Sequence, residues 1–166
     1  MRVMVVYESV WGNTEKIAQE IAAGFDDVEV EVREVSEESE IGDNLDLLVL
    51  GGPTHAFSMS SSSTRDSARN QGATNIPKIG IREWIERQKT PTRPILVATF
   101  DTKVVTPRLP GSAAKKAMKP LIALGFQPLA KPKTFRVHGY SGPVAEGELE
   151  RAREWGAELA QDLRHL

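Results

Sequence analysis

Short apolar runs alternate along this chain with stretches whose apolar residues recur at helical spacing, and no other feature constrains the fold as strongly. Apolar runs of about four to eight residues are typical of strands buried in a sheet. The runs that we interpret as strands are 2–7, 28–35, 45–52, 95–100 and 129–137. The strict alternation of 28–35 indicates a half-covered strand at an edge of the sheet. Pro132 weakens the last strand, because proline cannot donate to a ladder.

Helical patterns lie between and after these runs. Ile17, Ile21 and Phe25 recur every four residues, which predicts a helix that begins near Asn13. Further helices are expected over 64–71, 81–88, 111–124 and 149–163. Pro120 lies inside the pattern at 111–124 and is expected to kink or break that helix, because it has no backbone N–H.

This alternation predicts a single α/β domain over residues 1–166, built as a doubly wound, mostly parallel sheet. A chain of 166 residues fits one domain with a sizeable core. In such folds ligands bind beyond the carboxyl ends of the strands, near the switch in strand order. The segments to inspect are therefore 8–14, 51–60 and 99–111.

Composition removes several classes of function. The chain has no cysteine, which excludes disulfides, thiolate catalysis and cysteine-ligated metals. Its net charge of -2 comes without a basic stripe, so we expect no nucleic-acid partner. No apolar stretch approaches the roughly 20 residues that cross a bilayer, and no signal peptide precedes the first strand. We therefore expect a cytoplasmic protein without membrane insertion, and we assign no metal ligand and no catalytic residue.

The junction between the first strand and the first helix has the composition of a phosphate site. It reads SVWGNT over residues 9–14 and matches neither the dinucleotide glycine pattern nor the nucleoside-triphosphate loop. Backbone N–H groups entering a helix can still converge on one anion, helped by the helix dipole. Ser9 and Thr14 would add hydroxyl donors, and Gly12 would let the backbone approach closely. The alternative is an ordinary helix cap.

At this point a family resemblance becomes specific. The stretch SVWGNTEKIAQEIAAGF resembles the phosphate loop and first helix of the flavodoxin family, whose pattern is [ST]-x-[ST]-G-x-T. The resemblance implies non-covalent flavin mononucleotide (FMN) and a five-stranded sheet of order 2-1-3-4-5 with helices on both faces. The phosphate site that it implies comprises Ser9, Val10, Trp11, Gly12, Asn13 and Thr14. Trp11 stands where the family usually has a hydroxyl residue, so we expect it to offer its backbone N–H while its ring packs over the loop or against the flavin.

The same resemblance implies two further flavin loops. The second comprises Pro53, Thr54, His55, Ala56 and Phe57, and the third comprises Thr99, Phe100, Asp101, Thr102 and Lys103. One hypothesis for His55 is that it titrates near neutral pH beside the reduced ring; the alternative is a surface histidine without a role. Asp101 is interpreted either as a hydrogen-bond partner of the pyrimidine edge or ribityl chain, or as an ordinary strand-end residue.

A Ser-rich segment over residues 58–78 is long for a loop. We interpret it as a lid or docking surface beside the flavin, with a solvated flexible loop as the alternative. Arg65 and Arg69 lie one helical turn apart within it. They either meet an anionic partner or face solvent.

Three functions remain open at this stage. The first is an FMN-binding electron-transfer protein that works with a redox partner protein or a small electron acceptor. The second is a small FMN-dependent oxidoreductase with a quinone or porphyrinogen type of substrate. The third is a flavin-free domain of the same fold that serves interaction or signalling. Whether the chain is an enzyme stays open.

Overall fold

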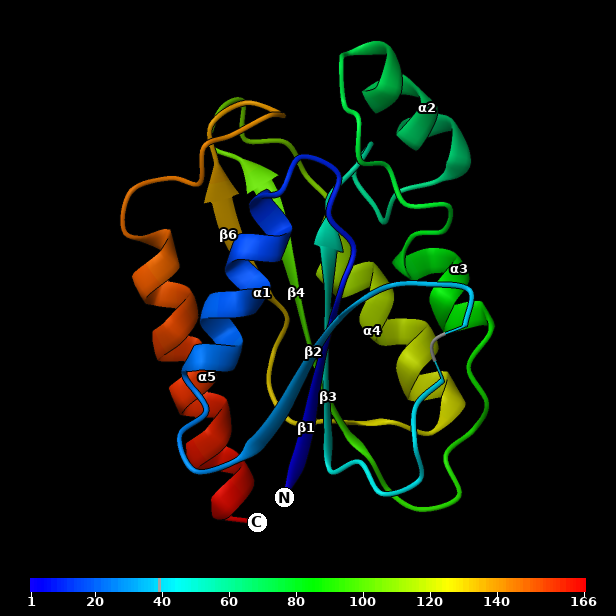
Figure 1. Ribbon diagram of the computed structural model, residues 1–166, viewed down its shortest axis with the longest axis vertical. Coiled ribbons are helices and arrows are strands. Elements are labelled where there is room, and N and C mark those ends of the chain that lie inside the picture. Colours follow the sequence, from blue (N-terminus) through cyan, green and yellow to red (C-terminus); the bar gives the residue numbers. More distant parts are fainter. Residues whose placement is uncertain (39) are drawn as a thin grey trace.

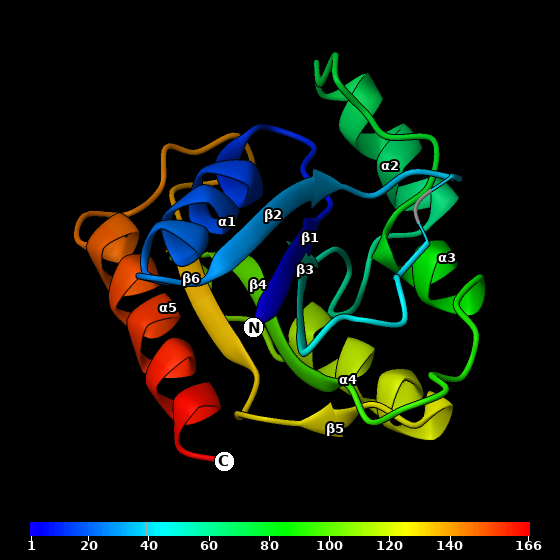
Figure 2. The ribbon, with the colours of Figure 1, turned by 60° about the horizontal axis from the view of Figure 1, so that its bottom comes forward.

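The computed structural model describes residues 1–38 and 40–166. Its centre is a parallel sheet of order β2-β1-β3-β4-β5, in which β6 also pairs with β4 (Figures 1 and 2). The strands are β1 (Arg2–Tyr7), β2 (Glu29–Glu34), β3 (Leu47–Pro53), β4 (Leu96–Val104), β5 (Gln127–Pro128) and β6 (Lys133–Val137). The predicted strand order and the edge position of 28–35 are confirmed.

The fifth strand of the prediction is wrong in one respect, because it exists as two pieces. β5 pairs with Leu96 and Val97 near the start of β4, whereas β6 pairs with the stretch from Phe100 to Val104. Pro132 lies in the gap between them. Since proline lacks the N–H that a ladder needs, the strand is interrupted there and the sheet has six strands in five positions.

Helices cover both faces of the sheet, as predicted. α1 (Asn13–Ala23) and α5 (Glu148–Arg164) lie on one face, and α3 (Ile81–Glu86) and α4 (Ala113–Leu124) lie on the other (Figure 1). The helix expected near 64–71 is α2 (Ser62–Asn70), which stands beyond the carboxyl ends of the strands. Within residues 1–38 and 40–166, no helix combines the length and apolar character that crossing a bilayer requires.

Two apolar layers form the core, because successive strand residues point to opposite faces. Val5 and Val49 pack toward α1 and α5, and Val6 and Leu50 pack toward α3 and α4. Gly156 of α5 lies directly against the backbone of α1, where a Cβ would clash with the Ile21 carbonyl. The tight contact between these helices therefore depends on glycine.

Pro120 does not break its helix. α4 continues through it to Leu124. Proline deprives the carbonyl four residues earlier, at Lys116, of its helical donor. Lys116 lies on the exposed side of the helix, so water can bond that carbonyl instead. The expected break is therefore wrong.

Candidate functional site

A pocket of about 340 Å³ opens at the carboxyl ends of the strands, where the strand order reverses between β1 and β3. Its walls come from the 10–14 junction, residues 53–56, the end of β4, the turn after β6 and one side of α2. Ligands of doubly wound folds bind at this place. All three segments selected from the sequence thus contribute to its walls, together with α2.

Gly12 shapes the first wall through its backbone conformation. Its φ is 91°, in the left-handed region that favours glycine, and an added Cβ would meet nothing within 4 Å. The structure thus gives a conformational reason for glycine at this position, and the close approach of Gly12 to a phosphate stays a prediction. Beside it, the Ser9 hydroxyl oxygen accepts the N–H groups of Gly12 at 3.1 Å and Glu15 at 3.2 Å. Ser9 therefore caps the start of α1.

Two donors at the start of α1 remain open. The N–H groups of Asn13 and Thr14 have no acceptor within the part of the chain that the structure describes. Both residues line the pocket and both are buried. The Thr14 hydroxyl lies 2.9 Å from the Thr102 hydroxyl, which ties the junction to β4. A helix start with free N–H groups is the kind of site that binds a phosphate.

The Trp11 ring packs against an aromatic residue that the sequence analysis missed. Its centroid lies 5.2 Å from that of Tyr140, with the planes tilted by 51°. Tyr140 follows β6, is 55% exposed and lines the pocket beside Trp11. The available signal was HGYSG at 138–142, a glycine-flanked aromatic residue that directly follows the last predicted strand.

The second loop is a tight turn fixed to β4 and α4. The Thr54 N–H donates to the Thr102 carbonyl at 2.9 Å, and the Thr54 hydroxyl accepts the Ala113 N–H at 3.0 Å. His55 and Ser58 exchange backbone hydrogen bonds of 2.8 and 3.0 Å. Pro53, Thr54, His55 and Ala56 line the pocket. Phe57 does not line it and is 51% exposed.

His55 is neutral at pH 7. Burial, and secondly the charge of Arg65, lower the pKa of His55 from 6.5 to about 4. Its Nδ1 lies 3.1 Å from the Thr64 hydroxyl of α2. In the protein without ligand, His55 therefore does not titrate near neutral pH, and its titration beside a reduced flavin stays a prediction. The main reason is the burial of His55, with the buried guanidinium of Arg65 second, and the sequence pattern revealed neither.

The prediction that residues 99–103 form a loop is wrong, because β4 continues through them to Val104. Thr99, Phe100 and Asp101 are fully buried. Thr99 donates to the Ala114 carbonyl at 2.9 Å, and the Asp101 carboxylate accepts the Ala114 N–H at 3.1 Å and the Ser112 hydroxyl. Asp101 thus caps α4.

The Lys103 ammonium donates to the Leu109 and Gly111 carbonyls. Of the five residues from Thr99 to Lys103, Thr102 alone lines the pocket.

A buried charged network anchors α2 and α3 to the end of β1. Glu8 is fully buried and accepts the Ser60 hydroxyl at 2.5 Å and the Ile81 N–H at 2.8 Å. Burial raises the pKa of Glu8 despite these bonds and the neighbouring Arg65. Arg65 is 5% exposed, bonds Ser60 at 2.8 Å and pairs with Glu83 at 2.5 Å. The interpretation of Arg65 as a solvent-facing residue is wrong.

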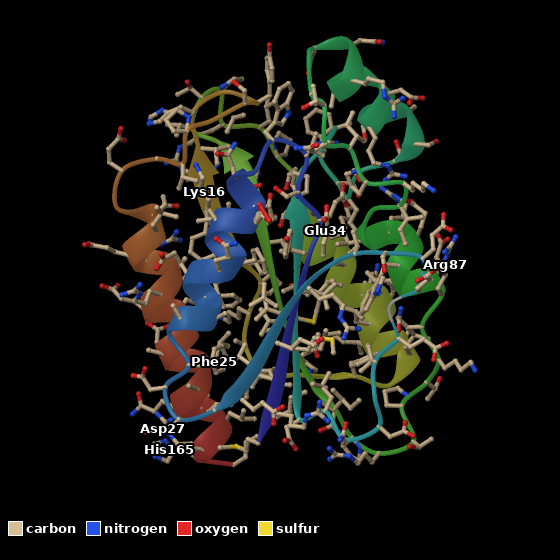
Figure 3. The ribbon with its side chains drawn as sticks, in the orientation of Figure 1. Lys16, Phe25, Asp27, Glu34, Arg87 and His165 are labelled. Atoms are coloured by element: carbon tan, nitrogen blue, oxygen red, sulfur yellow. The ribbon has the colours of Figure 1, made fainter. Side chains whose placement is uncertain are left out.

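Arg69 does face solvent, where it pairs with Asp66 at 2.9 Å. The remaining histidines, His138 and His165, do not line the pocket. His138 bonds Glu146 on the surface. His165 lies close to the C-terminus, at the lower end of the molecule in Figure 3. Among the described residues, no three His, Asp or Glu side chains are placed to hold a metal ion.

Comparisons with known proteins agree with this architecture. No family model and no curated protein matches the chain. The solved structure of oxidised flavodoxin 1 from Bacillus cereus matches with a TM-score of 0.70 at 18% identity, over 100% of this chain and 99% of its own. A flavodoxin from the domain Archaea gives 0.66 at 16%, over 99% and 100%. The flavodoxin, WrbA-like protein from Agrobacterium tumefaciens gives 0.58 at 19%, over 99% and 98%. The chain therefore has the flavodoxin-like fold.

Proposed function

We propose that this chain, which has the flavodoxin-like fold, binds FMN in the smaller pocket and serves in electron transfer with a redox partner protein or a small acceptor. One observation carries the proposal. The open N–H donors of Asn13 and Thr14 lie in a pocket at the switch in strand order, where a phosphate-bearing ligand binds in this class of sheet.

The residues present fit FMN. Asn13, Thr14 and the backbone of Val10 and Trp11 would hold its phosphate, and no Lys or Arg is found among the described residues that line the pocket. Helix and backbone dipoles would then supply the positive potential. Thr54, His55 and Ala56 bring backbone to the opposite wall, and the Trp11–Tyr140 pair forms an apolar rim. When bound, FMN supplies one- and two-electron transfer.

Titration of FMN into the purified protein tests the proposal, with flavin fluorescence and visible absorption as readouts. Thr14→Val removes one hydroxyl donor. Because a hydrogen bond to a charged group is worth about 1.5–3 kcal/mol, we expect FMN affinity to fall at least about tenfold. Thr90→Val, which changes an exposed threonine outside the pocket, is the control and leaves affinity unchanged. A wild-type protein that binds no FMN, or equal affinities for both variants, contradicts the proposal.

A second candidate function rests on α2. Thr64, Ser67 and Gln71 line the pocket, so this helix narrows the approach to any bound ring. That geometry favours a small substrate over a large protein partner and supports the alternative of an oxidoreductase for a quinone or porphyrinogen type of compound. Reduced, FMN-loaded protein can be mixed with a quinone and, separately, with a protein acceptor. Faster reoxidation by the quinone supports the enzyme, and faster reoxidation by the protein supports the carrier.

A further inference from the structure

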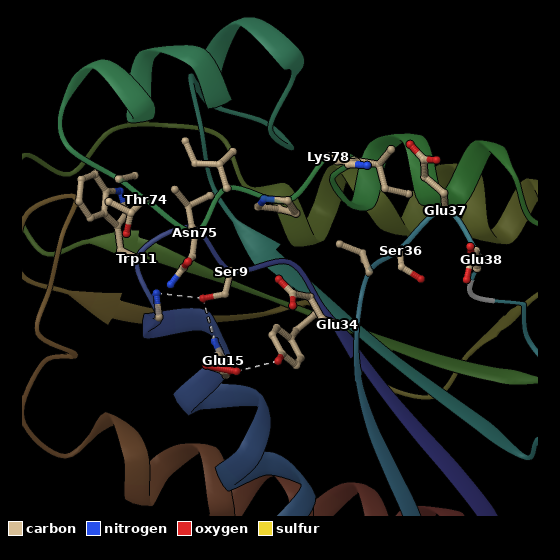
Figure 4. A pocket seen from close by; sticks show the side chains of 18 of the residues that line it. Ser9, Trp11, Glu15, Glu34, Ser36, Glu37, Glu38, Thr74, Asn75 and Lys78 are labelled. Atoms are coloured by element: carbon tan, nitrogen blue, oxygen red, sulfur yellow. Dashed lines mark hydrogen bonds between the residues drawn. The ribbon is translucent and has the colours of Figure 1, made fainter.

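A second and larger cavity lies on the other side of the 9–12 junction. It has a volume of about 750 Å³ and opens over the carboxyl ends of β1 and β2 (Figure 4). Val10 and Trp11 line both cavities. The volume falls within the range of about 300–1,000 Å³ that is usual for small-molecule sites. A ligand whose phosphate lies on this junction can therefore extend into either cavity.

Glu34 is the open hydrogen-bond acceptor of the larger cavity. It ends β2 and pairs in register with Tyr7 of β1. The Tyr7 hydroxyl donates to Glu15 at 2.7 Å rather than to Glu34. Within residues 1–38 and 40–166, no donor and no cation bonds the Glu34 carboxylate. Partial burial, and secondly the Glu15 charge, raise the pKa of Glu34.

Glu34 lies at a position where acidic residues of other doubly wound folds bind a ribose. In doubly wound folds that bind dinucleotides, a carboxylate about 20 residues after the glycine loop accepts the ribose hydroxyls of the nucleoside. Glu34 follows Gly12 by a similar distance and likewise ends the strand beside β1. The glycine pattern of those proteins is absent here, but the juxtaposition of helix start and strand-end carboxylate is present.

The opposite wall suits a planar base. The segment 73–79 places Ile76, Pro77 and Ile79 along the cavity, and Thr74 and Asn75 add polar groups there (Figure 4). Apolar surface covers the faces of a base, and amide and hydroxyl groups bond its edges. Glu37 and Glu38 line the cavity as well, with Lys78 as the one described basic residue among the lining. This charge balance repels a phosphate inside the cavity, so the part of a ligand that lies there is expected to be an uncharged nucleoside.

We propose that the larger cavity binds a purine ribonucleoside, with the ribose hydroxyls donated to Glu34 and the base held along the 73–79 segment. Such a nucleoside reaches the site either free or as the adenosine half of flavin adenine dinucleotide (FAD). The FAD form rests on the proposed function, because it needs the flavin half in the smaller pocket. The binding of free adenosine does not depend on it.

Calorimetric titration with adenosine tests the nucleoside site by itself. We expect 2′,3′-dideoxyadenosine, which lacks the 2′- and 3′-hydroxyls of the ribose, to bind at least tenfold more weakly than adenosine. We expect Glu34→Ala to remove this difference. Glu29→Ala, which removes an exposed carboxylate from the other end of the same strand, should preserve it. Absence of adenosine binding, or equal binding of the two nucleosides to the wild type, overturns the proposal.

Comparison of FAD with FMN tests the extended form. We expect the wild type to bind FAD at least tenfold more tightly than FMN, and Glu34→Ala to lose that advantage with FMN binding unweakened. If Glu34 merely repels anions, its removal tightens both flavins equally, which overturns the assignment. The two proposals fail differently. A protein that binds neither flavin but still distinguishes adenosine from its dideoxy analogue contradicts only the flavin function.

Discussion

Replacement of His55 by glutamine is expected to change how the stability of the ligand-free protein depends on pH. His55 is partly buried beside Arg65, and its pKa falls from 6.5 to about 4 on folding. The folded state therefore binds this proton less well than the unfolded chain. The stability contributed by neutral His55 is complete above pH 6.5 and is lost as the pH falls toward 4.

The size of the effect follows from the pKa values. At about 1.36 kcal/mol per unit, a lowering from 6.5 to about 4 corresponds to roughly 3 kcal/mol in full. Most of this difference is present at pH 4.5. Because of His55, the free energy of unfolding of the wild type should therefore be about 2.5 kcal/mol lower at pH 4.5 than at pH 7.5. A glutamine side chain cannot take up a proton in this range. Between pH 7.5 and pH 4.5, the free energy of unfolding of the His55→Gln protein should therefore fall by about 2.5 kcal/mol less than that of the wild type.

Urea unfolding at pH 7.5 and pH 4.5 measures the effect, with the free energy of unfolding compared between proteins at each pH. His165→Gln, at an exposed position at the far end of the molecule, is the matched control for the loss of one histidine. If wild type and His55→Gln lose the same stability between the two pH values, the burial argument is refuted.

Three more substitutions test other contacts. Gly156→Ala places a Cβ against the Ile21 carbonyl and should lower the free energy of unfolding by about 1–3 kcal/mol in urea titrations, with Ala157→Ser, at an exposed position beside it, near neutral. Arg65→Met leaves Glu8 and Glu83 without their cation and should cost about 3–5 kcal/mol. Arg69→Met, on the exposed side of the same helix, should change thermal stability little. Gly12→Ala forces a left-handed conformation on a side chain and should cost about 1–2 kcal/mol, measured on ligand-free protein. An unchanged denaturation midpoint contradicts each of the three expected losses.

Most helices and strands could be predicted from the sequence, because they follow from local periodicity in the apolar residues. Apolar runs with a period of two and helical patterns with a period near 3.6 identify strands and helices without knowledge of their partners. The end of β4 was wrongly predicted as a loop, because its structure depends on contacts between distant residues and not on local periodicity. Asp101 and Thr102 look like loop residues by composition, but Asp101 caps α4 and Thr102 bonds the second loop and Thr14. These contacts join positions far apart in the chain and leave no periodic signal.

Two features of the site were not predicted, because each depends on contacts between residues that are far apart in the sequence. Tyr140 is far along the chain from Trp11, and only the folded sheet brings the rings together. Glu8 and Arg65 are ordinary surface residue types that become buried as one network. Charged residues are almost never fully buried unless they are paired. Sequence alone identifies neither the buried Arg65–Glu83 ion pair nor the burial of His55. The lowered pKa of His55 could therefore not be foreseen.

The same network explains why the candidate phosphate site carries no side-chain cation among the described residues. Arg65 belongs to α2, and Thr64, Ser67 and Gln71 at this helix line the smaller pocket. Its guanidinium instead bonds Ser60 and Glu83, where it is held in a buried ion pair. The charge of Arg65 is therefore committed to anchoring the helix. An anion in the pocket must then rely on the open N–H groups at the start of α1. Because Asn13 and Thr14 are buried, salt screens an anion at this site less, and its affinity should depend less on ionic strength than that of a site built from exposed lysines.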